Sequence, residues 1–255
     1  MELEGQEAES FLFAGLPEQH MPSGRLPGGT LVGNGKYRLG ALSRLGAFGE
    51  VYTATVVTSG ARVAIGIIAP ELLPTRPAPD RLADKLAAAS RIDHKNIIRT
   101  LDAGVEGESA FFVMEEVDGR SLHELLQQKR EVGQAAFSLR GACSIVTHIL
   151  NALAYAHTST FHGALTTANV FVDRSGQVKL TEFGLAQALP VLARLGNAVH
   201  AGDLAAMAPE FVATPELVDA RADIYSTGAI LFELLTGRAP SESLFRPSTI
   251  LAGLH

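Results

Sequence analysis

Strand-like and helix-like patterns are segregated along this chain of 255 residues. From Tyr37 to about residue 115 the sequence carries short, partly alternating runs rich in β-branched residues, separated by turn residues, which is typical of antiparallel strands. After Gly119 the apolar residues recur at helical spacing, most clearly at about 139–157 and 221–235. Strands followed by helices predict an α+β fold in which a small β-rich lobe precedes a larger helical lobe.

Residues 1–36 follow neither pattern. Ten glycine or proline residues interrupt this segment, which is too many for a helix or strand of useful length. We therefore expect a flexible N-terminal extension over 1–36, a β-rich lobe over 37–114 and a helical lobe over 115–255. The apolar run FLFAGL at 11–16 has two interpretations, a docking motif that orders on a partner or an apolar patch that folds back on the domain.

The charges and the single cysteine exclude several classes of protein. The formal net charge is −6 and the charged residues are scattered, so there is no basic face to bind a nucleic-acid backbone. Cys143 is the only cysteine, which excludes a disulfide framework or a thiolate metal cluster within one chain. The acidic N-terminus lacks a secretion signal, and no apolar run reaches the ~20 residues that span a bilayer. We expect a cytoplasmic protein with no nucleic-acid partner and no membrane insertion.

Eight short stretches carry the most specific information. They are RLGAFGEVY (44–52), VAIG (63–66), HKNII (94–98), FVMEEVDGRSL (112–122), FHGALTTANVFV (161–172), VKLTEFGLA (178–186), MAPE (207–210) and DIYSTGAILFELLTG (223–237). Their order and spacing resemble those of the eukaryotic-type protein kinase domain, as found in bacterial serine/threonine kinases. The resemblance covers about residues 37–238 and implies a bilobal, protein-kinase-like fold. It also implies that the C-lobe is truncated after the helix at 221–235, because such lobes normally continue through further helices.

The resemblance implies a set of catalytic positions, and the chain departs from it at three of them. Gly66 stands where the family has the lysine that holds the nucleotide, and Lys85 stands where the family has the partner glutamate of that lysine. Ala164 replaces the aspartate that accepts the proton of the substrate hydroxyl, and alanine has no basic atom. We therefore expect no catalytic residues and no enzymatic activity, as in a pseudokinase.

Nucleotide and metal positions are retained in part. The resemblance places eight residues around a nucleotide: Arg44, Gly46, Gly49, Ala64, Met114, Glu115, Val117 and Phe171. Arg44 replaces the first glycine of the phosphate-covering loop. Its guanidinium either contacts phosphate, or instead closes the cleft or reaches solvent. Asn169 and Glu182 match the two magnesium-binding positions, although glutamate is one methylene longer than the aspartate of the family.

Two hypotheses for the function follow. The first is a catalytically inactive kinase-like domain that needs no cofactor and serves as a scaffold or regulatory module, binding a protein partner or a second copy through its C-lobe. The second is an atypical nucleotide-binding switch, or a weak nucleotide-dependent enzyme, that binds ATP with magnesium at Asn169 and Glu182. The activation segment, 185–210, contains no Ser, Thr or Tyr, so we expect no switching by phosphorylation within it.

Overall fold

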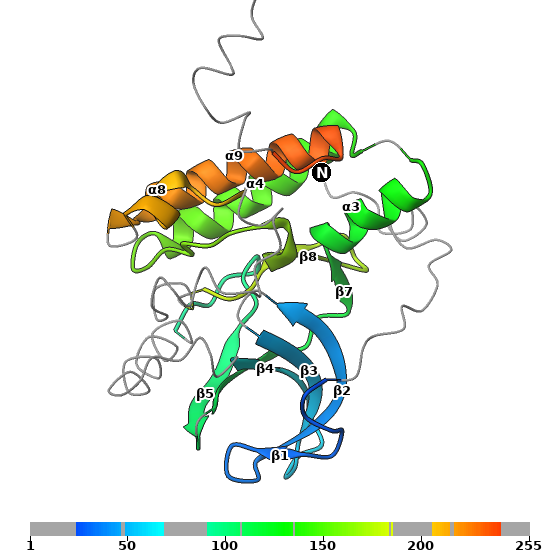
Figure 1. Cartoon of the computed structure of the whole chain (residues 1–255), viewed down its shortest axis with the longest axis vertical. Coiled ribbons are helices and arrows are strands. Elements are labelled where there is room, and N and C mark those ends of the chain that lie inside the picture. The colour runs from blue at the N-terminus through cyan, green and yellow to red at the C-terminus, as the bar shows by residue number, and fades with distance from the viewer. Residues whose placement is uncertain are drawn as a thin grey trace, which may run out of the picture.

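The computed structural model of the chain describes residues 24–46, 49–68, 91–107, 109–134, 136–183, 185, 206–214 and 217–240. These residues form a β-rich N-lobe and a helical C-lobe, which confirms the predicted bilobal α+β fold (Figure 1). The apolar run at 11–16, Lys85, most of the activation segment and residues 241–255 lie outside the described residues. None of the described helices has the length and apolar character that crossing a membrane requires.

Six antiparallel strands build the N-lobe sheet in the order β1-β2-β3-β4-β6-β5. Their bounds are β1 Leu31–Val32, β2 Tyr37–Gly46, β3 Gly49–Val56, β4 Arg62–Ile68, β5 Thr100–Glu106 and β6 Ser109–Glu115. Successive side chains of a strand point to opposite faces. Tyr52 and Phe111 accordingly belong to a core cluster within the N-lobe. Their neighbours Val51 and Phe112 belong to a second cluster that also includes residues of the C-lobe.

Residues 24–36, which belong to the predicted flexible extension, are instead held against this sheet. Strand β1 pairs with the start of β2, and the Gly29 amide donates to the Leu39 carbonyl at 2.8 Å. The Leu26 amide donates to the Tyr52 hydroxyl at 3.0 Å, and the Gly33 amide donates to the Glu106 carboxylate at 2.8 Å. These hydrogen bonds and the strand pairing offset the entropic cost of ordering a segment rich in glycine and proline.

The sequence pattern predicts a strand near 97–102, whereas strand β5 begins only at Thr100. Ile97 instead forms a bridge with Leu180 of the C-lobe, and the Ile98 amide donates to the Leu180 carbonyl at 2.7 Å. The first part of the predicted strand therefore links the two lobes rather than extending the N-lobe sheet.

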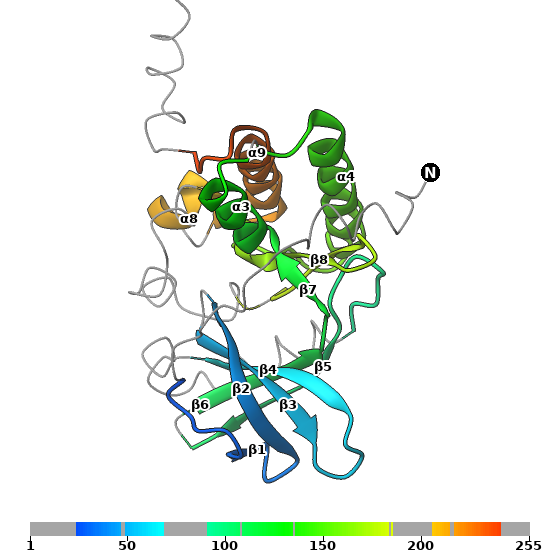
Figure 2. The same ribbon diagram turned by 90° about the vertical axis from the view of Figure 1, so that its right-hand side faces the viewer.

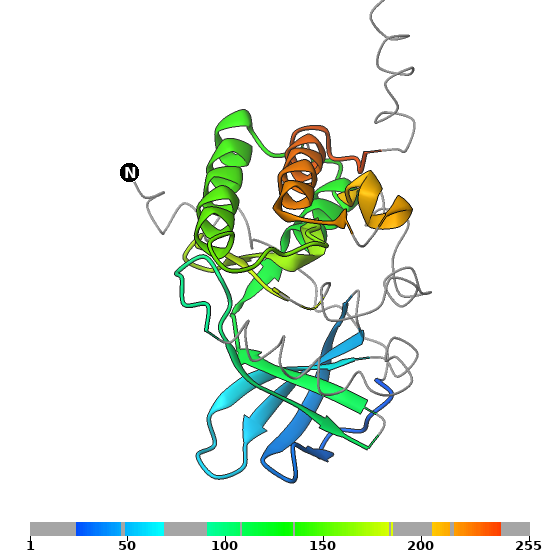
Figure 3. The same cartoon turned by 90° about the vertical axis from the view of Figure 1, so that its left-hand side faces the viewer.

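The described C-lobe contains a three-stranded sheet, in the order β7-β8-β9, and helices α3, α4, α8 and α9. The bounds are β7 Gly119–Ser121, α3 Leu122–Glu131, α4 Leu139–Ala156, β8 Val170–Asp173, β9 Val178–Leu180, α8 Pro209–Ala213 and α9 Ala220–Thr236. Helices α4 and α9 match the two long helices predicted from the sequence and lie side by side (Figures 2 and 3). Ile149 and Leu153 of α4 share a buried core with Ile230 and Leu234 of α9.

The ends of helix α9 follow from its local sequence. The Asp219 side chain caps the N-terminus by accepting from the Arg221 amide, which supplies an acceptor for a backbone donor that the helix leaves unpaired. The helix ends at Gly237, whose φ of 69° lies in the left-handed region that glycine adopts without steric cost. The cap places Asp223 in the first turn of α9, where its buried carboxylate faces the loop that contains His162 and Gly163.

Candidate functional site

The cleft between the lobes holds a cavity of about 110 Å³. Six of the eight predicted nucleotide-binding residues line it, namely Arg44, Ala64, Met114, Glu115, Val117 and Phe171. The other two, Gly46 and Gly49, pair with each other where β2 turns into β3. Three strands of the N-lobe and β8 of the C-lobe thus bring most of the predicted set together, although the sequence separates its members by more than a hundred residues.

The position of the missing lysine is filled by an aromatic ring. Gly66 of β4 lies opposite Phe112 of β6 in the antiparallel register. A Cβ atom on Gly66 would overlap the Phe112 ring, so even alanine does not fit unless the ring moves. Sequence reasoning missed Phe112. A glycine within a buried strand predicts that a neighbouring group approaches closely, but the strand register is needed to identify that group.

Arg44 of β2 reaches across the cleft to Glu182, which follows β9. The guanidinium donates to a Glu182 carboxylate oxygen, with Nη2 and Oε1 2.8 Å apart. Both side chains are largely buried, 13% exposed for Arg44 and 2% for Glu182. The guanidinium also lies over the Phe171 ring, 5.1 Å from its centroid, which adds a cation–π contact. The guanidinium therefore lies across the cleft with its charge matched by a protein group, and a role in contacting phosphate stays a prediction.

The other oxygen of Glu182 is also occupied. The Asn169 amide nitrogen donates to Glu182 Oε2 at 2.8 Å, and the Asn169 amide oxygen accepts from the Thr166 amide and hydroxyl at 3.1 and 3.0 Å. Glu182 has a φ of 69°, a conformation that costs a residue other than glycine about 1–3 kcal/mol and that clusters at functional sites. The two residues therefore lie together as the sequence indicated, held by contacts to other protein groups.

Magnesium does not fit these side chains as they lie. The ion needs several oxygen ligands in near-octahedral geometry. Here both Glu182 oxygens accept from nitrogen donors, and the Asn169 amide oxygen is turned toward Thr166. Among the described residues there is also no group of three or more His, Cys, Asp or Glu side chains able to hold a metal ion. As metal ligands, Asn169 and Glu182 stay a prediction.

On the C-lobe side of the cleft, a second buried carboxylate organises the loop that contains Ala164. Asp223 accepts from the amides of His162 and Gly163 at 2.8 and 2.7 Å, and His157 Nε2 lies 2.8 Å from the same carboxylate. His162 also contacts the Thr181 carbonyl at 2.8 Å and the Phe183 ring edge-on. Ala164 is buried in an apolar cluster, so a methyl group stands where the resemblance places a general base.

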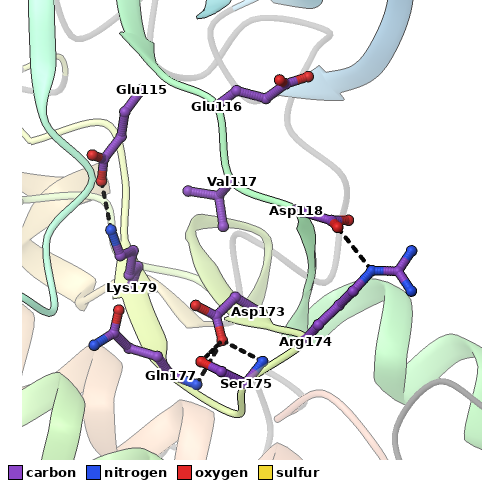
Figure 4. Close-up of a pocket in the computed structure, with 9 residues that line it drawn as sticks. All are labelled: Glu115, Glu116, Val117, Asp118, Asp173, Arg174, Ser175, Gln177 and Lys179. Carbon is purple, nitrogen blue, oxygen red and sulfur yellow. Dashed lines mark hydrogen bonds and ion pairs between the residues drawn. The ribbon is translucent and has the colours of Figure 1, made fainter. Parts of the chain in front are cut away.

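A larger cavity, of about 300 Å³, lies beside residues 115–118, which connect the lobes. Two ion pairs join this connection to the C-lobe sheet: Lys179 with Glu115 at 2.6 Å and Arg174 with Asp118 at 2.8 Å (Figure 4). Asp173 accepts from Ser175 and from the Gln177 amide within its own turn. The two ion pairs fix the connection between the lobes against the C-lobe.

Comparison with known proteins gives consistent results. The family described as protein kinase domain matches residues 40–249. A probable serine/threonine-protein kinase of Streptomyces coelicolor is 34% identical over 213 residues, covering 81% of this chain and 31% of that protein. The serine/threonine-protein kinase PrkC of Bacillus subtilis is 30% identical over 208 residues, covering 81% of this chain and 31% of that protein. The chain thus spans about a third of the length of these curated relatives.

The fold has close counterparts among solved structures. The crystal structure of the PknI kinase domain of Mycobacterium tuberculosis superposes with a TM-score of 0.68 at 22% identity, covering 85% of this chain and 79% of that chain. At this level of identity the likeness shows the fold alone. It confirms the kinase-type arrangement of the two lobes that the eight sequence stretches predicted.

The relatives correct one prediction. From Gly66, Lys85 and Ala164 we expected that the chain is not an enzyme. That expectation is contradicted, because relatives 30–34% identical over most of the chain are named serine/threonine-protein kinases, which are enzymes. The expectation failed for a physical reason: a replaced side chain shows which chemical group is missing from one position, and not what the rest of the site can do. Three replaced residues therefore do not decide whether a chain of this family is an enzyme.

Proposed function

The chain belongs to the protein kinase family, and we propose that it works there as a regulatory module that binds another protein. In this role the relative position of the two lobes is the signal that the partner protein reads. The state of the interlobe cleft sets that position. The curated relatives are each about three times as long as the segment that matches this chain.

One contact supports this role above the others, the ion pair between Arg44 and Glu182. It joins β2 of the N-lobe to the segment after β9 of the C-lobe, across 138 positions of sequence. Removing one partner of a buried ion pair strongly destabilises the folded protein, because the other charge is left without compensation. The pair therefore acts as a latch that favours one arrangement of the lobes, and anything that competes for either side chain releases it.

The loop at 162–164, on the C-lobe side of the latch, supports the same role. The Asp223 carboxylate is fully buried and accepts from two backbone amides, so the loop at 162–164 is fixed without any contribution from a ligand. A rigid C-lobe and an N-lobe latched to it together offer a partner a surface of defined shape. We place the module in the cytoplasm, where its single cysteine, Cys143, stays reduced.

The experiment measures the distance between the lobes in the whole chain. Cys143 on α4 is exposed, and a Thr58→Cys change in the exposed turn after β3 adds a second labelling site in the N-lobe. We expect one narrow distribution of dye-to-dye distances by single-molecule energy transfer, and a broad one after Arg44→Met. The control is Arg38→Met, because Arg38 is an exposed arginine on the same strand.

The same three proteins, produced in the native host, test the binding role by cross-linking and mass spectrometry. We expect a set of cross-linked proteins that is the same for the unaltered chain and for Arg38→Met, and that changes with Arg44→Met. Distances and cross-linked proteins that are the same in all three would refute the proposed role.

A further inference from the structure

Residues 24–30 form a strap that is held against the start of β3 by hydrogen bonds. The Glu50 carboxylate accepts from the Arg25 amide, whose nitrogen lies 3.1 Å from each carboxylate oxygen. The Tyr52 hydroxyl donates to the same carboxylate at 2.5 Å and accepts from the Leu26 amide at 3.0 Å. Two side chains of β3 therefore bind two consecutive amides of the strap through one connected set of hydrogen bonds.

The strap lies on the surface, and the residue that anchors it is buried. Tyr52 is 1% exposed, so the surrounding core fixes its ring, and a Cβ atom on Gly24 would be 2.3 Å from its hydroxyl oxygen. The Leu26 side chain packs on the same core, whereas Arg25 and residues 27–29 are exposed. A segment with few buried apolar contacts and an exposed backbone opens more easily than the sheet beside it. We therefore expect the strap to open before the sheet does.

The strap and the latch hold opposite faces of the hairpin formed by β2 and β3. Arg44 pairs with Val51 across the two strands, and Leu45 pairs with Glu50. Directly opposite residues share a face of the hairpin, and successive residues alternate between its faces. Arg44 and Val51 accordingly line the cleft, whereas Glu50 binds the strap. Since the hairpin is held from both sides, loss of the contact on one face loosens the contact on the other.

The end of the hairpin links the two contacts. A Cβ atom on Gly46 would be 3.1 Å from Arg44 Nη1 and 3.4 Å from Glu182 Oε1, so the latch is packed against the backbone at this residue. Gly46 pairs with Gly49, which directly precedes Glu50. A shift of Glu50 on release of the strap therefore moves the backbone against which the latch is packed.

We propose that the strap controls the latch: docked on Glu50 and Tyr52 it keeps the Arg44–Glu182 pair closed, and its release opens the pair. The contact that switches the lobes then lies on the surface of the N-lobe, where a partner protein reaches it more easily than the buried pair. The proposal deepens the regulatory role and rests on it, because it names the segment that regulates the latch. Linkage requires the strap and the latch to affect each other by the same factor.

The first test removes the latch and observes the strap. Hydrogen exchange of the whole chain, followed by mass spectrometry, measures how often the amides of residues 24–30 open. We expect Arg44→Met to raise their exchange rate at least about fivefold, which is the lower end of typical couplings between two sites. Arg38→Met, which changes an exposed arginine of the same strand, should leave the rate unchanged. The same exchange rate in Arg44→Met as in the unaltered chain would overturn the proposal.

The reverse test releases the strap and observes the lobes. Gly24→Ala places a methyl group where the buried Tyr52 hydroxyl lies, so the strap amides should exchange at least about tenfold faster. In the doubly labelled chain described above, we expect the dye-to-dye distances to broaden as they do in Arg44→Met. Gly28→Ala, in the same segment, is the control, because its Cβ atom would be 3.4 Å from the nearest listed atom, the Gly40 carbonyl oxygen, which is an ordinary contact.

A second variant covers the case in which Gly24→Ala fails to fold. Tyr52→Phe removes the hydroxyl that binds the Leu26 amide and keeps the ring, so it should broaden the distances without a steric clash. Narrow distances in a variant whose strap amides exchange faster would overturn the control of the latch by the strap. That result leaves the proposed function intact when Arg44→Met broadens the distances. If Arg44→Met leaves the distances narrow, the proposed function fails, and strap exchange in Arg44→Met still shows whether the strap and the ion pair are coupled.

Discussion

Two buried carboxylates, Asp223 and Glu182, are stabilised in different ways. Asp223 accepts from the backbone amides of His162 and Gly163 and contacts His157, all within the C-lobe. Glu182 accepts from two side chains, Arg44 from the N-lobe and Asn169 from the C-lobe. Backbone amides in a folded loop cannot turn away, whereas side chains can exchange partners by rotating. The first carboxylate therefore maintains a shape, and the second is suited to a change of state.

The comparison is tested most strongly by Asp223→Ala. The change leaves two buried amides and one histidine without their acceptor, and hydrogen bonds to charged groups contribute about 1.5–3 kcal/mol each. We expect the free energy of unfolding to fall by about 3–5 kcal/mol, as for other broken buried charge networks. Urea unfolding followed by circular dichroism measures it. A loss below about 1 kcal/mol would show that Asp223 does not anchor the loop at 162–164.

Arg44→Met is expected to have a smaller effect on stability. Its partner Glu182 keeps the hydrogen bond from Asn169, and the Arg44 side chain is itself 13% exposed, so part of the lost contact is replaced by water. We expect a loss of about 2 kcal/mol, most of it recovered in the double variant Arg44→Met with Glu182→Gln, which removes the unpaired charge. If the two single changes simply add, the side chains are not coupled and there is no latch.

Gly66→Ala tests the closed position of the missing lysine. The added methyl group overlaps the Phe112 ring, and overpacking of a core costs about 1–3 kcal/mol. We expect a loss near the lower end, about 1 kcal/mol, because one ring at the edge of the cleft has room to tilt. The double variant Gly66→Ala with Phe112→Leu should recover stability. An unfolding midpoint unchanged by Gly66→Ala alone would mean that Phe112 does not fill this space.

The sequence was sufficient for features that depend on local pattern and on motif order. The helices at 139–157 and 221–235 could be predicted because a buried helix face repeats at helical spacing, and the two-lobe arrangement because the motifs occur in kinase order. The Arg44–Glu182 contact could not be predicted, since a long side chain reaches several partners and only the fold brings these two within 2.8 Å. The role of Phe112 depends on strand register, which the sequence does not define.

The smallest expected effect is a pH dependence of stability that arises from His94. His94 stacks on Tyr155, with ring centroids 5.1 Å apart, and its Nδ1 accepts from the Asn96 amide at 3.1 Å. Burial, and to a lesser extent the nearby charge of Lys95, lower the pKa of His94 below its ordinary value of 6.5. The unfolded chain therefore binds more protons than the folded chain once the pH falls below about 6.5, and the free energy of unfolding decreases there.

His94→Phe keeps an aromatic ring against Tyr155 but cannot take up a proton. We expect this variant to be less stable overall, because the Asn96 amide loses its acceptor, and to lose less stability than the unaltered chain between pH 7 and pH 5. Urea unfolding across this range measures both. The interlobe distance should stay constant over the same range, because the contacts described for His94, with Tyr155 and Asn96, do not involve the Arg44–Glu182 pair. An interlobe distance that changed with the protonation of His94 would show that this part of the C-lobe surface and the Arg44–Glu182 latch are coupled. The distinction between the two carboxylates would then fail.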